Sequence, residues 1–202
     1  MFELNHVYNM DCMEGMREIP DKYFELAIVD PPYGINIPGK IGKGTDLKAF
    51  DDSKVPTREY FSSLARVSQN QLIWGGNYFC DHLGAFRCFI VWDKNNYGLT
   101  FADCELAWSS IDGVARIFKY RPQNMDGGKV HPTQKPIDLY KWLLSNYAKP
   151  GDKILDTHVG SGSSIIACID MGFDYMGFEI DEDYYKAMQD RIYHFTRQEK
   201  LI

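Results

Sequence analysis

The sequence lacks any long hydrophobic run. No stretch of its 202 residues approaches the roughly 18 consecutive apolar residues of a membrane-spanning helix. The opening residues, Met1-Phe2-Glu3-Leu4-Asn5-His6, have neither the basic nor the apolar segment of a secretion signal. We therefore expect a cytoplasmic protein with no membrane partner.

Paired cysteines and clustered metal ligands are also missing. The five cysteines are scattered and include no Cys-x-x-Cys pair. His6, His82 and His194 stand too far apart to show the spacing of metal ligands. The sequence thus predicts reduced cysteines that serve mainly as packing residues, and no metal site.

Basic residues are fewer than acidic ones, with 22 Lys and Arg against 28 Asp and Glu, which gives a net charge of −6. Such a surface repels a polyanion as a whole, so any contact with nucleic acid has to use a local basic patch. Two groups of side chains are candidates for phosphate contacts: Lys40, Lys43 and Lys48 in a Gly- and Lys-rich loop over 36–54, and Lys119, Arg121 and Lys129.

Short apolar runs alternate with amphipathic stretches along the chain, and 45% of the residues are hydrophobic, as in a globular domain with a sizeable core. Buried strands are predicted at 26–30, 71–74, 88–92, 105–108, 153–156 and 175–180. Helical spacing predicts helices at 57–68, 136–148, 161–171 and, capped by Asp181, up to 197. This alternation predicts a doubly wound α/β fold with a mainly parallel sheet.

The tetrapeptide Asp30-Pro31-Pro32-Tyr33 directly follows the first buried strand. Ligands of open α/β sheets bind beyond the carboxyl ends of the strands, which places this motif where chemistry is expected. The two prolines have carbonyls but no N–H donors, so with Asp30 they suit an exocyclic amine that donates two hydrogens. Tyr33 offers a face for base stacking, worth ~1–3 kcal/mol. The alternative is a Pro-Pro turn capped by Asp30.

A second motif runs from Asp156 to Gly162, where a predicted strand passes through Gly160-Ser161-Gly162 into a helix. Such a turn lets the backbone approach a ligand at a helix N-terminus. Glu179, at the end of the next strand, is placed to accept hydrogen bonds from ribose hydroxyls. Ile165 stands where a dinucleotide motif has its third glycine, so a nucleoside cofactor without pyrophosphate fits better. A purely structural turn is the alternative.

A third motif, His131-Pro132-Thr133-Gln134-Lys135-Pro136, leads into the predicted helix at 136–148. The Thr133 hydroxyl and the Lys135 ammonium are groups that can hold a carboxylate. The same residues also suit a capping turn, with Thr133 as the cap and Pro136 at the first helical position.

Together these motifs resemble those of the S-adenosylmethionine-dependent DNA amino-methyltransferases, in the group whose Asp-Pro-Pro-Tyr motif precedes the Gly-rich motif. The resemblance spans nearly the whole chain. It implies a seven-stranded, circularly permuted methyltransferase (Rossmann-like) sheet in a single domain, 1–202. Residues 1–130 would form the catalytic and target-base half, and 131–202 the S-adenosylmethionine half. A separate target-recognition domain is missing.

The resemblance also implies a role for each motif. Asp30, Pro31, Pro32 and Tyr33 hold the target amine and its base. The implied cofactor-binding residues are Asp11, Cys12, Thr133, Lys135, Asp156, His158, Gly160, Ser161, Gly162 and Glu179. Thr157-His158 departs from the Pro-Phe that the family usually has there. Asp11 is equally well explained as the N-cap of a short helix.

The implied activity is site-specific methyl transfer from S-adenosylmethionine to N6 of adenine in DNA, as in restriction-modification, by a homodimer. Adenine is favoured because the family's N4-cytosine enzymes more often begin the motif with Ser than with Asp. Alternatives are an N4-cytosine methyltransferase and a catalytically silent cofactor-binding subunit of a DNA-modifying complex. A glutamine-amide acceptor and a dinucleotide oxidoreductase are less favoured.

Overall fold

The computed structural model describes residues 2–35, 52–99, 102–125, 130–131 and 133–198. Most of the Gly- and Lys-rich loop, with Lys40, Lys43 and Lys48, lies outside these residues, as does Lys129.

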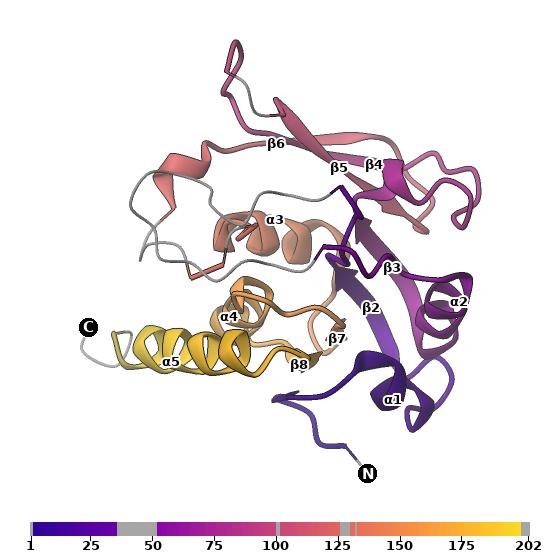
Figure 1. Cartoon of the computed structure of the whole chain (residues 1–202), viewed down its shortest axis with the longest axis vertical. Helices are drawn as coiled ribbons and strands as arrows, with labels where there is room; N and C mark the ends of the chain where they lie inside the picture. Colours follow the sequence, from indigo (N-terminus) through magenta and orange to yellow (C-terminus); the bar gives the residue numbers. More distant parts are fainter. Residues whose placement is uncertain (1, 36–51, 100–101, 126–129, 132, 199–202) are drawn as a thin grey trace.

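The described chain forms one sheet with helices around it (Figure 1). Its strands are β1 (His6–Tyr8), β2 (Phe24–Val29), β3 (Ser68–Trp74), β4 (Phe89–Asp93), β5 (Cys104–Ser109), β6 (Arg116–Lys119), β7 (Lys153–Asp156) and β8 (Asp174–Phe178). Its α-helices are α1 (Cys12–Arg17), α2 (Arg58–Val67), α3 (Ile137–Tyr147), α4 (Ser163–Met171) and α5 (Glu182–Gln198), and two short 3₁₀ turns cover Gly76–Tyr78 and Pro122–Asn124.

The strands lie in the order β1-β8-β7-β2-β3-β5-β4-β6, and only β5 runs antiparallel to its neighbours. The predicted α/β class and mainly parallel sheet are therefore confirmed. All six predicted strands and four predicted helices are present, with ends shifted by no more than three residues. That the sheet is a circularly permuted form of the methyltransferase sheet stays a prediction.

The sheet has eight described strands where seven were expected. The strands missing from the predicted set are β1 and β6, the two edge strands of the described sheet, and β6 pairs only with β4. The apolar residue Ile117 of β6 is 60% exposed, so the segment has no buried apolar run by which a strand is recognised in a sequence.

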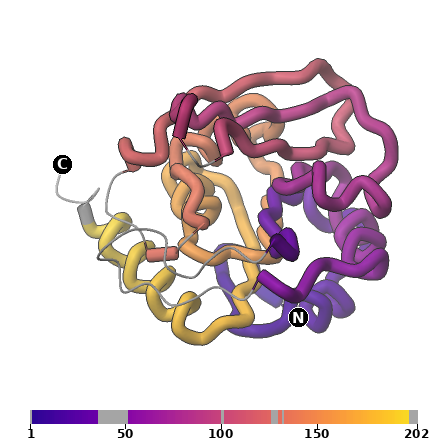
Figure 2. Tube along the Cα trace, turned by 45° about the horizontal axis from the view of Figure 1, so that its top comes forward, coloured from indigo at the N-terminus to yellow at the C-terminus, as the bar shows by residue number. Residues whose placement is uncertain are grey.

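Alternate residues of β2 enter two separate cores, which is the packing of a doubly wound sheet. Ala27 and Val29 join a core with α1 and α2, whereas Leu26 and Ile28 join a core with α3 and α4. Helix α5 adds a smaller core near β1 and β8 through Met188. Figure 2 shows α5 and the β4–β6 segment on opposite sides of the molecule.

The strand order brings the motif-bearing strands together. Strand β2, which precedes Asp30, lies beside β7, which ends at Asp156, and β7 lies beside β8. Because these three strands are parallel, their carboxyl ends meet at one edge of the sheet. Strand β1 adds to this edge, where the Glu179 N–H donates to the Tyr8 carbonyl oxygen at 3.0 Å.

Of two helix N-caps predicted from the sequence, the structure has one and lacks the other. Asp181 caps α5 as predicted, since its carboxylate accepts hydrogen bonds from the N–H groups of Asp183 and Tyr184. The predicted cap at Thr133 is wrong, because Pro136 occupies the N-cap position of α3 with extended backbone. No helix in the described ranges has the length and apolar character to cross a membrane.

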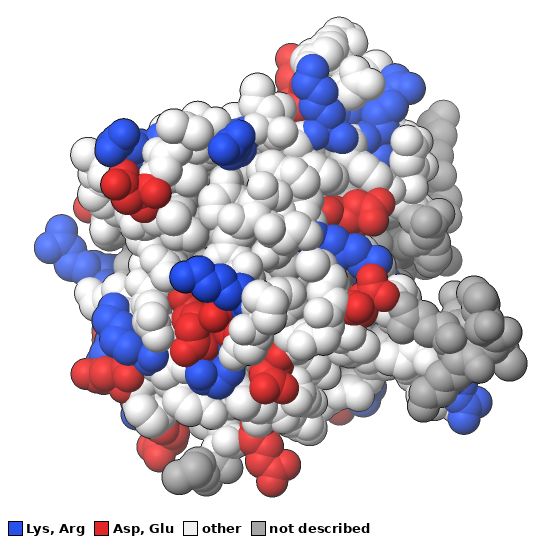
Figure 3. Space-filling model, turned by 180° about the vertical axis from the view of Figure 1, so that it is seen from behind, with Lys and Arg blue, Asp and Glu red and all other residues white. Residues whose placement is uncertain are grey.

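Basic and acidic side chains are mixed on the face seen in Figure 3. Of the predicted phosphate-binding groups, Lys119 is described: its side chain is 72% exposed, and its ammonium lies 3.9 Å from a carboxylate oxygen of Asp93. Arg121 is described too, and its Nε donates to the Asn95 carbonyl oxygen at 3.1 Å.

Candidate active site

A cavity of about 1210 Å³ opens at the carboxyl ends of β2, β7 and β8. It is lined by Asp30, Pro31, Pro32 and Tyr33 and by Asp11, Cys12, Thr133, Lys135, His158, Gly160, Ser161 and Glu179. All four predicted catalytic residues and all but two of the predicted cofactor-binding residues thus share one cavity. The two exceptions are Asp156 and Gly162.

Tyr33 is held in place by contacts on several sides. Its hydroxyl donates to Asp30 Oδ1 at 2.5 Å, and its ring stacks on that of Tyr78 at 5.0 Å. A Cβ added to Gly75, whose φ is +72°, would lie 2.3 Å from the Tyr33 ring, so this close approach requires glycine. The Asp30 motif is a rigid platform as well as a turn.

Asp52 fixes the backbone that follows this platform. Its two carboxylate oxygens accept hydrogen bonds of 2.7 Å from the N–H groups of Tyr33 and Ile35. Asp52 is buried and lines the cavity. Sequence reasoning missed it because an Asp in a Gly- and Lys-rich stretch has no periodicity to mark it.

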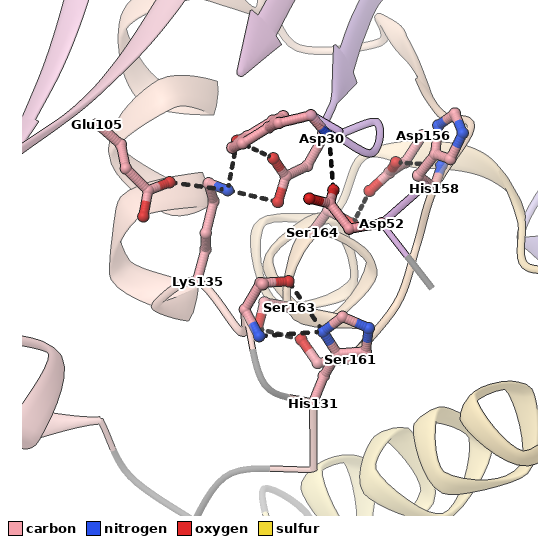
Figure 4. A network of polar contacts seen from close by, with 12 residues as sticks. Asp30, Asp52, Glu105, His131, Lys135, Asp156, His158, Ser161, Ser163 and Ser164 are labelled. Atoms are coloured by element: carbon pink, nitrogen blue, oxygen red, sulfur yellow. Dashed lines mark hydrogen bonds and ion pairs between the residues drawn. The ribbon is translucent and has the colours of Figure 1, made fainter. Parts of the chain in front are cut away.

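Lys135 lies between two carboxylates, as Figure 4 shows. Its ammonium contacts Asp30 Oδ2, Glu105 Oε2 at 3.1 Å and the Tyr33 hydroxyl at 3.3 Å, and its side chain is 2% exposed. Burial alone would lower the pKa of Lys135, but the two carboxylates outweigh it and raise that pKa above its ordinary value. The Lys135 ammonium thus contacts two carboxylates of the protein itself, whereas the sequence predicted that it holds a carboxylate of the cofactor.

The two carboxylates respond differently to the same lysine. Burial, helped by the charge of Glu105, raises the pKa of Asp30 by more than Lys135 and Tyr33 lower it. The pKa of Glu105 is lowered overall, because Lys135 and Lys94 together outweigh its burial. The Lys94 ammonium lies 2.6 Å from Glu105 Oε1, and Lys94 also lines the cavity.

Sequence reasoning missed Glu105, although a carboxylate inside the apolar strand β5 was a usable signal. It also missed Asn96, which is buried, lines the cavity and has no hydrogen-bond partner for its Oδ1 among the residues described.

Glu179 lines the cavity directly after β8. Its Oε2 accepts from the Gly160 N–H at 2.8 Å, and its Oε1 accepts from the Asp181 N–H at 2.9 Å. Burial raises the pKa of Glu179. These bonds fix the carboxylate where it lines the cavity, and each oxygen keeps a lone pair for a ligand hydroxyl.

Polar side chains replace the family's aromatic contact beside the Gly turn. The Thr157 hydroxyl is 3.0 Å from His158 Nδ1 and 2.7 Å from the Tyr60 hydroxyl. Burial lowers the pKa of His158 to about 4, so its ring is neutral near pH 7. A neutral ring packed edge-on against Tyr60 provides a flat wall much as a phenyl ring would.

Asp11 is the N-cap of α1 and also lines the cavity, and its role in cofactor binding stays a prediction. Its carboxylate caps α1 by accepting from the Met13 N–H at 2.8 Å. The adjacent Cys12 is a free thiol whose pKa is raised to about 12, chiefly by burial. It is therefore a neutral packing residue in the cavity wall.

Asp156 and Gly162 lie behind the cavity wall, which corrects their predicted place. Asp156 accepts from the Ser164 hydroxyl at 2.5 Å and from the His158 N–H at 2.9 Å, so it braces the turn. Gly162 has a φ of +79°, and an added Cβ would lie 2.7 Å from Met188 Cγ. Both residues shape the turn from within.

Thr133 lines the cavity and bonds to its own motif. Its hydroxyl lies 3.0 Å from Nδ1 of His131, whose ring packs against Tyr184 with centroids 4.3 Å apart. Burial, helped by the charge of Lys135, lowers the pKa of His131 to about 4. Within the described ranges, no group of His, Cys, Asp and Glu side chains is arranged to hold a metal ion.

A family model described as DNA methylase, N6_N4_Mtase, matches residues 73–190, more than half of the chain. The chain belongs to the N6/N4 DNA methylase family. This confirms the predicted family. The type II methyltransferase M.HinfI of Haemophilus influenzae is 23% identical in an alignment that is 246 residues long with its gaps. The alignment covers 94% of this DNA methylase and 68% of M.HinfI.

Two solved structures share the fold of this DNA methylase. The M1.HpyAVI–SAM complex has a TM-score of 0.67 at 18% identity, covering 93% of this chain and 98% of that one. The PvuII DNA methyltransferase, which is cytosine-N4-specific, has a TM-score of 0.60 at 15% identity, covering 95% and 91%. The family and these neighbours leave adenine and cytosine both open as targets.

Proposed function

We propose that this DNA methylase transfers a methyl group from S-adenosylmethionine to the exocyclic N6 amine of adenine in DNA. The observation that carries the proposal is that the Asp30 motif and Glu179, far apart in the sequence, line a single cavity. One motif suits an amine acceptor and the other suits a nucleoside cofactor.

The charge of the cavity wall fits S-adenosylmethionine, whose sulfonium is positive. Acidic lining residues outnumber basic ones: Asp11, Asp30, Asp52, Glu105, Glu179 and Asp181 face Lys54, Lys94 and Lys135. We assign the ribose hydroxyls to Glu179 and the adenine to the wall around Asp11 and Cys12. Thr133, His158, Gly160 and Ser161 line the part assigned to the remaining cofactor.

The cofactor, when bound, supplies an electrophilic methyl group on its sulfonium. Asp30 and the Pro31 carbonyl accept the two amine hydrogens, which localises the lone pair on nitrogen. That lone pair forms the new N–C bond while the electron pair of the C–S bond leaves with sulfur. The methylated amine then releases a proton to Asp30, whose pKa is raised by burial, so that it can take up that proton.

The target base has to reach this platform from a duplex. Extruding a base costs a few kcal/mol, and stacking on Tyr33 offsets part of that cost. We propose that residues 1–130 serve mainly the target base and 131–202 mainly the cofactor within a single domain. Three side chains cross this division, since Asp11 and Cys12 are assigned to the adenine of the cofactor and Lys135 contacts Asp30.

The test is incubation of the purified protein with labelled S-adenosylmethionine and mixed-sequence duplex DNA, followed by nucleoside analysis. Labelled N6-methyldeoxyadenosine is the expected product. Labelled N4-methyldeoxycytidine would instead identify cytosine as the target base. Tight cofactor binding without any methylated nucleoside would favour the silent-subunit alternative.

A further inference from the structure

The Lys135 ammonium is saturated by groups of the target-base end of the cavity. It carries three hydrogens, and three acceptors surround it: Asp30 Oδ2, Glu105 Oε2 at 3.1 Å and the Tyr33 hydroxyl at 3.3 Å. No hydrogen is left for a ligand. A cofactor carboxylate brought to this ammonium would also face two carboxylates of its own charge.

We propose that Lys135 is a positioning residue that acts on Asp30 rather than on the cofactor, and that Glu105 is its anchor. This inference rests on the proposed function, because it assigns Lys135 and Glu105 a part in presenting Asp30 to the target amine. It also replaces the role that the motif resemblance implies for Lys135.

The geometry explains what Lys135 supplies to Asp30. One oxygen of the Asp30 carboxylate accepts from Tyr33 and the other contacts Lys135, so the plane of the carboxylate is fixed. Each oxygen keeps a further lone pair for the incoming amine. Only the ionised carboxylate can accept there with both oxygens, and a buried Asp30 facing Glu105 without a cation between them favours its protonated form.

Glu105 ties this arrangement to the antiparallel part of the sheet. Lys94, Glu105, Lys135 and Asp30 form a row of alternating charge that runs from the end of β4 through β5 to the end of β2. A lysine held from both sides has one stable position. The titratable and charged groups that interact electrostatically with Asp30, Lys135 or Glu105 are Tyr33, Tyr60, Lys94, His131, Tyr140 and Asp156.

Two substitutions shift the ionisation of Asp30 in opposite directions. Lys135→Met removes the positive charge that lowers the pKa of Asp30, so this pKa rises. Glu105→Gln removes a negative charge that raises it, so the pKa of Asp30 falls. A role that is only structural does not produce shifts of opposite sign.

The experiment compares the parent with Lys135→Met, Lys135→Arg, Glu105→Gln and a matched control, Lys153→Met. Lys153 also pairs with a carboxylate, Glu25 at 3.0 Å, and lies near an aromatic ring, but at the opposite end of β7. The measurements are S-adenosylmethionine affinity by calorimetry, kcat against pH, and the Asp30 carboxyl titration by carbon-13 NMR.

For Lys135→Met we expect kcat near pH 7 to fall at least about tenfold while the S-adenosylmethionine Kd stays within about twofold. The acid limb of kcat and the Asp30 titration move to higher pH in Lys135→Met and to lower pH in Glu105→Gln. Lys135→Arg restores part of the activity. Lys153→Met changes neither the acid limb of kcat nor the Asp30 titration.

A Kd raised about tenfold in Lys135→Met, with an unshifted Asp30 titration, would overturn the inference and restore the cofactor clamp. Thermal melts verify that each variant folds. If Lys135→Met fails to fold, Glu105→Gln decides by the direction in which the Asp30 titration moves. The NMR titration needs no turnover, so it decides even if the parent methylates no DNA and the proposed function fails.

Discussion

At the residue scale, Asp30 and Glu179 line one cavity, and the proposed function assigns them separate tasks, so their substitutions are expected to separate chemistry from binding. Asp30→Ala removes the charged acceptor of the target amine. Turnover should fall by ~10²-fold or more, the usual effect of losing one such contact in the transition state. S-Adenosylmethionine affinity, measured by calorimetry, should persist. Turnover near that of the parent would remove Asp30 from the mechanism.

Glu179→Ala should have the reverse effect. Two ribose hydroxyls lose a charged acceptor, and each such hydrogen bond contributes roughly 1.5–3 kcal/mol, so the Kd for S-adenosylmethionine should rise by more than about tenfold. Turnover at saturating cofactor should change less. Glu182→Ala is the control, because its exposed carboxylate pairs with Lys186 on α5. An unchanged Kd for Glu179→Ala would place the ribose elsewhere.

Asp156 gives the protein an unusual dependence of stability on pH. Burial raises its pKa to about 7 in the folded protein, so between about pH 4 and 7 the folded state holds a proton that the unfolded chain has released. This group therefore lowers stability as pH rises. The pKa values of His131 and His158 are lowered to about 4. Between about pH 4 and 6.5 these two groups therefore raise stability as pH rises.

Asp156→Asn removes the contribution of Asp156 to the pH dependence of stability and leaves the contribution of His131 and His158. We expect the free energy of unfolding of this variant to rise more steeply with pH, between about pH 4 and 7, than that of the parent. Urea unfolding across this range measures the slope. Asp112→Asn, which alters an exposed carboxylate, should parallel the parent. Parallel curves for Asp156→Asn would contradict the raised pKa.

At the element scale, the turn between β7 and α4 depends on the packing of α5. Gly162 and Gly172 flank α4 with nearly the same backbone, at φ values of +79° and +72°. A Cβ at Gly162 would overlap Met188 of α5, whereas one at Gly172 meets nothing within 4 Å. The two glycines therefore separate backbone strain from packing.

Gly172→Ala should lower the free energy of unfolding by about 1–2 kcal/mol through backbone strain alone. Gly162→Ala should lower it further, because Met188 has to move. Chemical unfolding of both variants provides the comparison. Equal losses would mean that Met188 yields freely and that α5 does not constrain the turn.

At the scale of the whole molecule, the net charge of −6 leaves local patches as the source of attraction to DNA. Each phosphate neutralised contributes about −0.9 to the slope of log affinity against log salt. Replacing Lys40, Lys43 and Lys48 with Ala should flatten that slope and weaken binding across sequences. Titrations at several salt concentrations measure both.

The matched comparison is replacement of Lys119 and Arg121, which are held by Asp93 and Asn95 in the structure. If the triple variant keeps the parental affinity and slope, these residues or a partner protein become the better candidates. The proposed homodimer is checked by sedimentation of the same samples, with and without DNA.

Much of this architecture is encoded locally and could be predicted. The α/β class follows from short apolar runs that alternate with helical spacing. The Asp30 and Asp156 motifs mark two of the strand ends at which the cavity opens. Prolines, glycines and buried strands act within a few residues of chain. Their order in the sequence is therefore enough to indicate where chemistry gathers.

What the tertiary structure decided is which partner each side chain meets. Lys135 contacts Asp30 and Glu105 because β2 and β5 both flank β3. Since β5 runs antiparallel, Glu105 near its start lies at the same edge of the sheet as Asp30, which follows β2. Asp156 lies behind the wall because Ser164 and the His158 N–H hold it there. Such pairings depend on strand order and burial, which act between residues far apart in sequence, and no local pattern records them.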